Sequence, residues 1–311
     1  MRLTRNHAGF AALVVIGVVA PLAGVYPTFL MKCWCFALFA CAFNLLIGYA
    51  GLLSFGHAAF FGAAAYLAGY AIKVWGLAPE LGILVGTTTA TGLGYVIGSL
   101  AIRRAGIYFA MVTLALAQML YFLWLQVRFT GGEDGLQGVP RGMLFGVLDL
   151  ADNMNLYYVV FAIFLFGFFI IYRTINSPFG QVLKAIRENE PRAISLGYDV
   201  DKYKLLAFVL SAALSGLAGA TKTVVFQLAS LTDAHWHMSG EVVLMTLVGG
   251  LGTVFGPVVG AFIVVSIEDQ LADKVGSWVQ VIMGVIFVVC VLAFRRGIAG
   301  ELVALARRIA R

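Results

Sequence analysis

Few side chains in this sequence are able to carry proton or metal chemistry, and the histidines come first. His57 follows the run 51–56, GLLSFG, and three roles are open to it: a proton relay, a polar group lining a passage, or a turn residue satisfied by one backbone carbonyl. His235 and His237 precede Glu241, and in an extended stretch their imidazoles would share one face. Because no third ligand stands at a suitable spacing, the sequence predicts no metal site.

The positions of the charged residues argue against a proton-driven carrier. We find no Asp or Glu in the interior of a long apolar run, whereas carriers of that class generally need titratable groups at membrane depth. Lys73 and Lys222 lie near the ends of apolar runs, where their ammonium groups are expected to extend to the membrane surface.

Signatures of enzymes and of disulfide proteins are also missing from the sequence. It contains no G-x-x-x-x-G-K-[ST] phosphate loop, no G-x-S-x-G elbow and no H-E-x-x-H motif. We therefore expect the chain not to be an enzyme and not to hydrolyse ATP by itself. Its cysteines lie in apolar runs without C-x-x-C spacing and are expected to be small buried side chains: Cys33, Cys35, Cys41 and Cys290.

The composition indicates the elements that must position these residues. Hydrophobic residues make up 61% of the 311 residues and charged residues only 12%, against roughly 25% in soluble proteins. We predict an all-α, polytopic transmembrane helical bundle of about 8–10 spans, as a single domain over residues 1–311. The net charge of +6 is typical of basic cytoplasmic loops and does not indicate nucleic-acid binding. The apolar windows are 8–30, 33–53, 57–75, 81–102, 105–127, 154–172, 205–226, 241–267 and 277–294.

Lys and Arg near span ends favour the cytoplasmic side and so predict the orientation. An inside N-terminus places the basic segment 173–204 inside and the acidic segment 128–153 outside. With the C-terminal tail also inside, 15 of the 21 Lys and Arg are cytoplasmic. Nine unbroken crossings would remove this bias. We therefore predict that both termini are cytoplasmic and that one window is broken.

The window 241–267 is the one predicted to break, because glycine and proline crowd its middle. We predict two half-helices or a re-entrant hairpin that enters and leaves from the outer face, surrounded by protein. The alternative is one straight helix with Gly252, Gly256 and Gly260 on a contact face. Other small-residue pairs also predict close helix packing: Gly94 with Gly98, Ala212 with Gly216, and Ser215 with Gly219.

The segment 173–204 carries its own helix signals. Ser177 and Pro178 predict a helix start followed by a helix over 179–187. A second start is predicted with Glu190 as the cap, and Gly197 is placed to end that helix in the left-handed conformation. Ala193, Ile194 and Leu196 are predicted to form one apolar face. Short helices with charged ends and such a face suit a groove on a cytoplasmic partner. The alternative is an ordinary basic loop.

Five stretches that follow one another along the chain resemble the permease subunits of branched-chain amino acid ABC importers. The Thr130 loop and the Ser177 block make the chain similar to the longer of the two permease types. The broader family marks its coupling region by Glu-Ala-Ala and a later Gly; Ala193 and Gly197 fit this register, whereas Pro191 and Arg192 do not. The stretches are 44–60 (NLLIGYAG, SFGHAAF), 106–115 (GIYFAMVTLA), 130–141 (TGG, DGL, VPR), 177–208 (SPFG, KAIRENE, LG, YKLLAF) and 239–257 (SGE, GGLGT, GP).

The resemblance implies a transport subunit that is worked by other proteins. Its partners would be a second homologous permease subunit, two cytoplasmic ATPase subunits that hold ATP and Mg, and an extracytoplasmic substrate-binding protein. The chain would bind no cofactor, no metal and no nucleic acid. It would lie among the lipids of the bacterial cytoplasmic (inner) membrane, with both termini cytoplasmic.

The resemblance also assigns roles to residues. Coupling to the ATPase falls to Glu190, Pro191, Arg192, Ala193, Ile194, Leu196 and Gly197. Candidates for the translocation pathway are Ser54, His57, Thr113, Gln118, Gly249, Gly250, Gly252 and Gly256. For Thr113 and Gln118 the alternative is hydrogen bonding between helices.

More than one substrate and more than one class of transporter are compatible with the sequence. The first expectation is branched-chain or other hydrophobic amino acids, while members of this family also move urea and short amides. A stand-alone secondary transporter that uses hydroxyls and the carbonyls of a broken helix is the second hypothesis.

Overall fold

The computed structural model describes residues 2–127 and 130–293 and confirms an all-α architecture. In this part of the chain, five helices are long and apolar enough to cross a membrane, namely α2 with η1, α4, α5, α6 and α9. The helices are α1 (Arg2–Val19), α2 (Pro27–Asn44), α3 (His57–Lys73), α4 (Pro79–Ala101), α5 (Ile107–Gln126), α6 (Asn153–Ile175), α7 (Pro178–Glu188), α8 (Glu190–Ser195), α9 (Val200–Phe226), α10 (Trp236–Gly249), α11 (Gly256–Val275) and α12 (Val279–Ala293).

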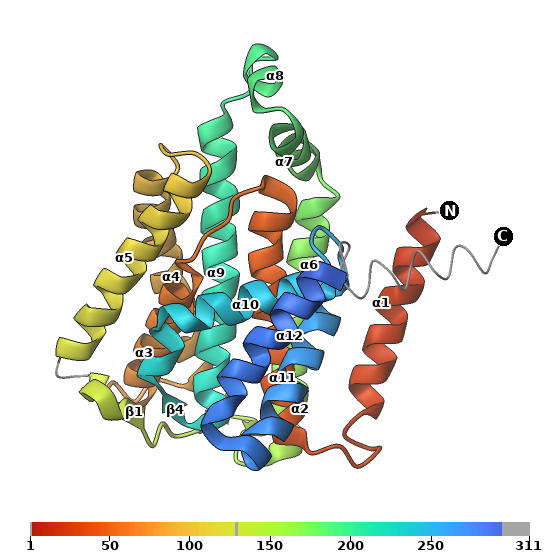
Figure 1. Ribbon diagram of the computed structural model, residues 1–311. Coiled ribbons are helices and arrows are strands. Elements are labelled where there is room, and N and C mark those ends of the chain that lie inside the picture. Colours follow the sequence, from red (N-terminus) through yellow and green to blue (C-terminus); the bar gives the residue numbers. More distant parts are fainter. Residues whose placement is uncertain (1, 128–129, 294–311) are drawn as a thin grey trace.

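Helix α2 lies at the centre of the bundle. Its residues from Met31 to Asn44 are buried apart from Lys32, as expected of a helix that is apolar on all sides. It packs against α6, α9, α10 and α11, while α9 also packs against α3 and α4 (Figure 1). A π-helical turn, η1 (Leu45–Ala50), ends α2, and residues 51–56 lead from it to α3.

The segments assigned by sequence to one side of the membrane share one end of the bundle. The start of α1, the turn between α4 and α5, and α7 with α8 all lie at this end, which we call the α8 end (Figure 1). The predicted outer loop lies at the opposite end, the strand end. Which end faces the cytoplasm stays a prediction. The tail arginines from Arg295 onwards lie outside the described residues.

The loop at the strand end is built from short 3-10 turns and two-residue strands. Strand β1 pairs antiparallel with β4, and β2 pairs antiparallel with β3. Arg141 fastens the loop to the bundle by donating to the Val225 carbonyl at 2.7 Å and to Asn153 Oδ1 at 2.9 Å. Its elements are η3 (Gly132–Asp134), β1 (Leu136–Gln137), β2 (Met143–Leu144), β3 (Leu148–Asp149), β4 (Leu228–Ala229) and η4 (Leu231–Ala234); a further 3-10 turn, η5 (Gly276–Trp278), links α11 to α12.

The largest difference between the predicted windows and the helices of the first half of the chain lies at the first connection. The windows 8–30 and 33–53 placed the break near Lys32, but α1 ends at Val19 and Pro27 starts α2 as its first residue. Lys32 is therefore inside α2. The helix tolerates this charge because the Lys32 ammonium lies 3.8 Å from Glu268 and 3.6 Å from Asp269.

The predicted break in the window 241–267 is confirmed. Helix α10 ends at Gly249 and α11 begins at Gly256, with a turn over residues 250–255 between them. The two helices pack closely, since a Cβ on Gly260 would lie 1.9 Å from the Met245 carbonyl oxygen. The glycines therefore serve both the break and the close contact.

The predicted small-residue contacts are also confirmed. A Cβ added to Gly94 would lie 2.5 Å from Ala212 Cβ, and one on Gly216 would lie 2.2 Å from Ala90 Cβ. On the neighbouring face, a Cβ on Gly219 would lie 2.1 Å from the Phe61 carbonyl oxygen. Helices α3, α4 and α9 thus approach one another at backbone distance.

We predict that Gly219→Ala destabilises the protein by about 1–3 kcal/mol, because the new methyl group meets rigid backbone rather than a movable side chain. Thermal unfolding of the detergent-purified protein measures the change. Gly92→Ala is the matched control, since a Cβ there meets nothing within 4 Å. Equal unfolding temperatures for the two variants would contradict the close contact between α3 and α9.

Candidate functional site

The first candidate site is the pair of short helices at the α8 end. Ser177 caps α7 as predicted: its side chain accepts from the Gly180 amide, and Pro178 is the first helical residue. The predicted cap of α8 is wrong by one residue. Asn189 caps α8 by accepting from the Arg192 amide at 3.1 Å, because its extended backbone forms the joint between the helices.

Glu190 is the first residue of α8 rather than its cap. Its carboxylate lies 2.6 Å from the ammonium of Lys204, whose side chain is 8% exposed. The ion pair joins α8 to the first turns of α9. Beside it, at the start of α9, the hydrogen bond from Lys202 lowers the pKa of the Asp199 carboxyl.

The C-terminal end of α8 has the geometry that the sequence predicted. Gly197 has φ +86° and donates to the Ile194 carbonyl at 2.9 Å, while Tyr198 donates to the Ala193 carbonyl at 3.2 Å. These two bonds form a Schellman motif. Caps at both ends therefore fix the shape of a helix that has only six residues.

The predicted common apolar face of Ala193, Ile194 and Leu196 is divided in the structure. Ala193 is buried against Ile186 and Val200, because it lies on the side of α8 that faces α7 and α9. Ile194 and Leu196 point the other way and are 57% and 68% exposed. Pro191 and Arg192 are also exposed. Two exposed aliphatic side chains thus lie on the outer side of the capped helix α8.

A hydrogen-bonded junction ties α7 to the break between α10 and α11. Asn44 donates to the Thr253 carbonyl at 2.9 Å and accepts from the Gly252 amide at 2.9 Å. Arg187 of α7 donates to the Gly48 carbonyl in η1. We call Asn44, Gly48, Arg187, Gly252 and Thr253 the Asn44 junction. The junction brings together residues from the stretches 44–60, 177–208 and 239–257. The last of these stretches contains the predicted glycines Gly249, Gly250 and Gly256.

His57 is fully buried at the start of α3. Its Nε2 lies 2.8 Å from Ser211 Oγ, and Ser211 donates to the Ala42 carbonyl at 2.6 Å. Since the serine proton goes to Ala42, His57 Nε2 carries the proton in the bond to Ser211. The rings of Phe43, Phe60 and Phe208 meet the imidazole edge-on. The hydrogen bonds and ring contacts of His57 therefore join α2, α3 and α9.

The neighbours of His57 hold the 51–56 segment against other helices. Ser54 Oγ accepts from the Gly56 amide, and Ser239 of α10 accepts from the Ala58 amide at 3.0 Å. Gly56 packs on Thr113 of α5, where a Cβ would lie 2.9 Å from the Thr113 carbonyl oxygen. Ser54 and Thr113 are fully buried. Gln118, further along α5, is half-buried.

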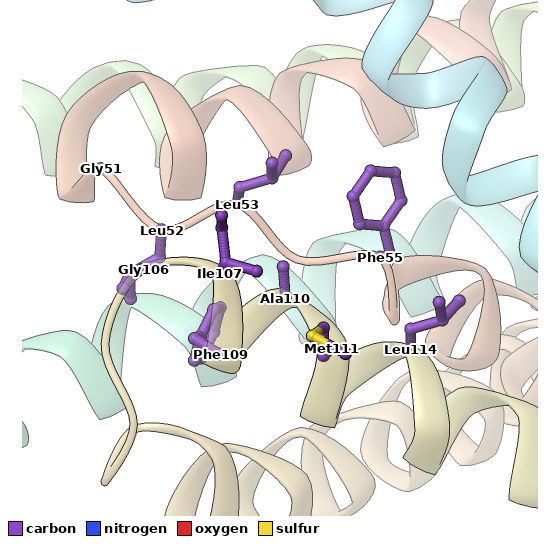
Figure 2. Close-up of a pocket in the computed structure, with 10 residues that line it drawn as sticks. All are labelled: Gly51, Leu52, Leu53, Phe55, Gly106, Ile107, Phe109, Ala110, Met111 and Leu114. Atoms are coloured by element: carbon purple, nitrogen blue, oxygen red, sulfur yellow. The ribbon is translucent and has the colours of Figure 1, made fainter.

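Two cavities adjoin the 51–56 segment. The first, of about 450 Å³, is apolar and lies between this segment and the start of α5 (Figure 2). The second, of about 510 Å³, lies between α10, α11 and α12, and we call it the α10–α12 cavity. Phe55 lines both cavities. Phe55 is therefore the residue of the 51–56 segment that the two described cavities share.

The α10–α12 cavity contains a carboxylate that the sequence reading missed. Because α10 begins at Trp236, before the predicted window, Glu241 lies in the second turn of the helix and lines the cavity together with Glu268. Helix α10 is not among the described helices found able to cross a membrane, so the expectation of no carboxylate inside a span stays a prediction. His235 and His237 do lie together, with ring centroids 5.3 Å apart, but at a helix start rather than in an extended stretch.

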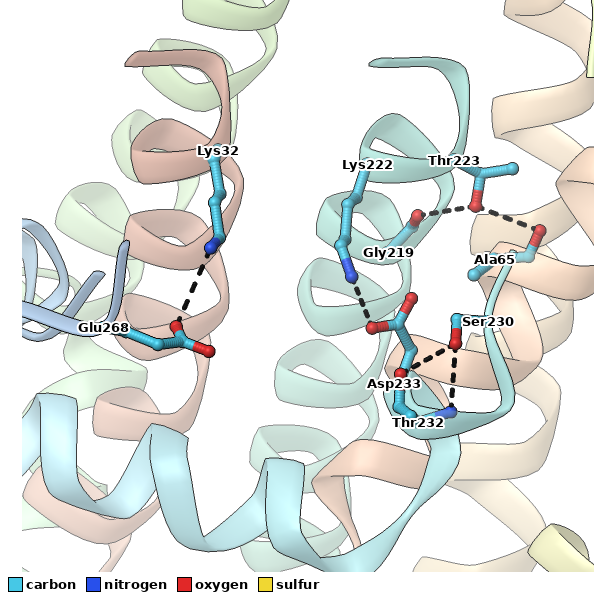
Figure 3. Close-up of polar contacts among 9 residues, drawn as sticks. All are labelled: Lys32, Ala65, Gly219, Lys222, Thr223, Ser230, Thr232, Asp233 and Glu268. Atoms are coloured by element: carbon cyan, nitrogen blue, oxygen red, sulfur yellow. Dashed lines mark hydrogen bonds and ion pairs between the residues drawn. The ribbon is translucent and has the colours of Figure 1, made fainter. Parts of the chain in front are cut away.

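Lys222 was predicted to reach the membrane surface, and this prediction is wrong. Its ammonium forms an ion pair with Asp233 and lies within 6 Å of the ring centres of Phe36, Phe61 and Phe226 (Figure 3). Asp233 is 2% exposed, so this charge is compensated inside the protein. Lys73 does extend outward, donating to the Gln137 carbonyl in the loop at the strand end.

Comparison with known proteins gives a family and several relatives. Residues 25–291 match the family described as branched-chain amino acid transport system / permease component. The chain is 27% identical over 258 residues to the high-affinity branched-chain amino acid transport system permease protein LivM of Escherichia coli (strain K12). The matched region covers 74% of this chain and 60% of that protein. The chain thus spans less than two thirds of this relative's length.

The other relatives include a second branched-chain amino acid permease and a ribose permease. The chain is 27% identical over 209 residues to a probable branched-chain amino acid transport permease protein LivM of Methanocaldococcus jannaschii, covering 61% of this chain and 57% of that protein. It is 28% identical over 196 residues to the ribose import permease protein RbsC of Bacillus subtilis (strain 168), covering 58% of each. No solved structure matches the chain.

We predict that Lys222→Met lowers the free energy of unfolding by about 3–5 kcal/mol, because it leaves the buried Asp233 carboxylate without its cation. Thermal unfolding in detergent measures the loss. Lys202→Met removes an ion pair whose two side chains are exposed and should leave the unfolding temperature unchanged. Similar losses in the two variants would show that burial of the Lys222 pair is not decisive.

Proposed function

Since the chain belongs to the family of branched-chain amino acid transport permease components, we propose that it forms half of the translocation pathway of an ATP-binding-cassette importer. A second homologous permease subunit supplies the other half. Two cytoplasmic ATPase subunits bind ATP and Mg, and a substrate-binding protein delivers the substrate at the strand end. The substrates are branched-chain or other hydrophobic amino acids.

The exposed pair Ile194 and Leu196 on α8 is the observation that supports this proposal most directly. Large apolar side chains on a capped turn beyond the end of the bundle are typical of a surface that another protein covers. The buried Ala193 and the Glu190–Lys204 ion pair fix α8 to α7 and α9. A partner that presses on α8 therefore moves these helices with it.

The Asn44 junction gives this movement a route to the passage. Arg187 connects α7 to η1, and Asn44 connects η1 to the turn between α10 and α11. A shift of α7 then displaces α10 and α11, which line the α10–α12 cavity. Closure of the ATPase subunits would in this way change which end of the bundle is open.

The passage itself runs along the face where the two cavities open, with Phe55 between them. Ser54, His57 and Thr113 act on this passage by holding the Phe55 segment, since all three are buried beside it rather than open to a cavity. Gly249, Gly250, Gly252 and Gly256 act through the turn that the Asn44 junction holds. The walls are mainly apolar, which suits a hydrophobic amino acid.

Reconstitution into proteoliposomes tests the function. The complete complex should take up leucine only with ATP, and this chain alone should show no flux. Gly197→Val should lower the leucine taken up per ATP hydrolysed, because a β-branched residue is strained at φ +86° and would reshape α8. Gly197→Asn is the control, since Asn tolerates this conformation. Leucine flux through the chain alone would support a secondary transporter instead.

We also predict that Asn44→Ala uncouples transport from hydrolysis. The variant loses two hydrogen bonds between η1 and the 250–255 turn, worth about 1 kcal/mol each, so leucine taken up per ATP should fall roughly tenfold. Asn155→Ala is the matched control, because Asn155 donates to the Asp149 carbonyl at the strand end, away from the junction. An unchanged ratio in Asn44→Ala would exclude the junction from the route.

A further inference from the structure

We propose that the α10–α12 cavity recognises the ammonium group of the substrate, with the Glu241 carboxylate as its partner. This rests on the proposed function and narrows it to a class of substrate: a small molecule that joins a cationic amine to an apolar chain. Urea and short amides, which carry no cation, fall outside this class.

The charges around Glu241 leave its carboxylate without a cation of its own. Of the neighbouring cations, Lys222 is paired with Asp233, and Lys32 lies between Glu268 and Asp269 (Figure 3). Within residues 2–127 and 130–293, the Glu241 carboxylate forms neither an ion pair nor a hydrogen bond. On the largely apolar wall of this cavity, a carboxylate that meets neither a cation nor a donor is costly. A ligand ammonium would supply the missing charge.

The rest of the cavity provides the apolar half of the site. Its walls come from three helices and are lined by Val243 and Leu244 of α10, Val264 of α11, and Met283 and Phe287 of α12. A volume of about 510 Å³ lies within the roughly 300–1,000 Å³ of small-molecule sites. A hydrocarbon side chain would therefore contact these walls while its amine meets Glu241.

The position of the cavity connects binding to movement. Phe55 lines both this cavity and the apolar cavity at the start of α5, and two of the helices around the α10–α12 cavity, α10 and α11, are joined by the turn that the Asn44 junction holds. When α10 and α11 shift, the carboxylate and the apolar walls separate or approach. Affinity for the amine would then differ between the conformations of the transport cycle, as transport requires.

Saturation-transfer NMR on the complete complex in nanodiscs tests the site directly. The probes are leucine, isopentylamine and 4-methylpentanamide, which share a branched chain but differ in charge. We expect leucine and isopentylamine to bind and the neutral amide to bind at least about tenfold more weakly, because the amide lacks the charge-assisted bond to Glu241. Equal binding of the three probes, or no binding of the two amines, would overturn the proposal.

Glu241→Gln is the decisive variant, since it keeps the shape of the side chain and removes its charge. It should weaken leucine and isopentylamine about tenfold or more, leave the amide unchanged and leave the unfolding temperature intact. Glu133→Gln, on the exposed loop at the strand end, is the matched control. Undiminished amine binding in Glu241→Gln would exclude Glu241 as the partner.

ATP-dependent leucine uptake by the same complex separates the two proposals. If the wild-type complex takes up leucine with ATP while Glu241→Gln binds and transports it normally, only the ammonium site fails. If the wild-type complex shows no ATP-dependent uptake, the proposed function itself fails.

Discussion

The need to satisfy backbone groups inside the helical bundle governs the centre of this protein. A break between two packed helices leaves amide and carbonyl groups without helical partners, and the break between α10 and α11 is such a place. Asn44 meets this need with one side chain, which accepts from the Gly252 amide and donates to the Thr253 carbonyl. Because Asn44 lies on the buried α2, the break is fixed to the centre of the bundle, and every element that contacts α2 is placed relative to it.

A second constraint is that charges inside the bundle must be compensated within the protein. Lys32 with Glu268 and Asp269 meets this constraint between two helices that are distant in sequence, whereas Lys222 meets it with Asp233 in the η4 turn, 11 positions further along the chain. The close contacts of α3, α4 and α9, by contrast, need only small residues and no charge. Both kinds of contact meet at α9, where Gly219 packs on the Phe61 backbone and the Lys222 ammonium lies 5.7 Å from the Phe61 ring centre.

Local patterns in the sequence predicted much of the fold. Apolar windows predicted most spans, Ser177 with Pro178 and Gly197 predicted helix ends, and clustered glycines predicted the break, because each of these signals acts within a few residues. The errors involve tertiary contacts that local patterns do not reveal. The carboxylates near Lys32 lie in α11, Asp233 lies 11 positions from Lys222 but outside its helix, and Asn44 and Thr253 are 209 positions apart. Glu241 was missed because the start of α10 depends on His235, which no apolar window includes. The short helices α7 and α8 could be placed by local caps, whereas the direction in which Ala193 points depends on its tertiary contacts.

The π-helical turn at the end of α2 determines which changes in sequence the contact with α7 tolerates. In η1 the carbonyl of Leu46 accepts from the amides of both Gly51 and Leu52, while the Gly48 carbonyl bonds outside the helix, to Arg187. It is the pitch of the backbone, rather than any side chain of η1, that presents this oxygen to α7. Different side chains over residues 45–50 would preserve the docking point as long as they preserved the wider pitch. An inserted or deleted residue would remove it even where every neighbouring amino acid stayed the same.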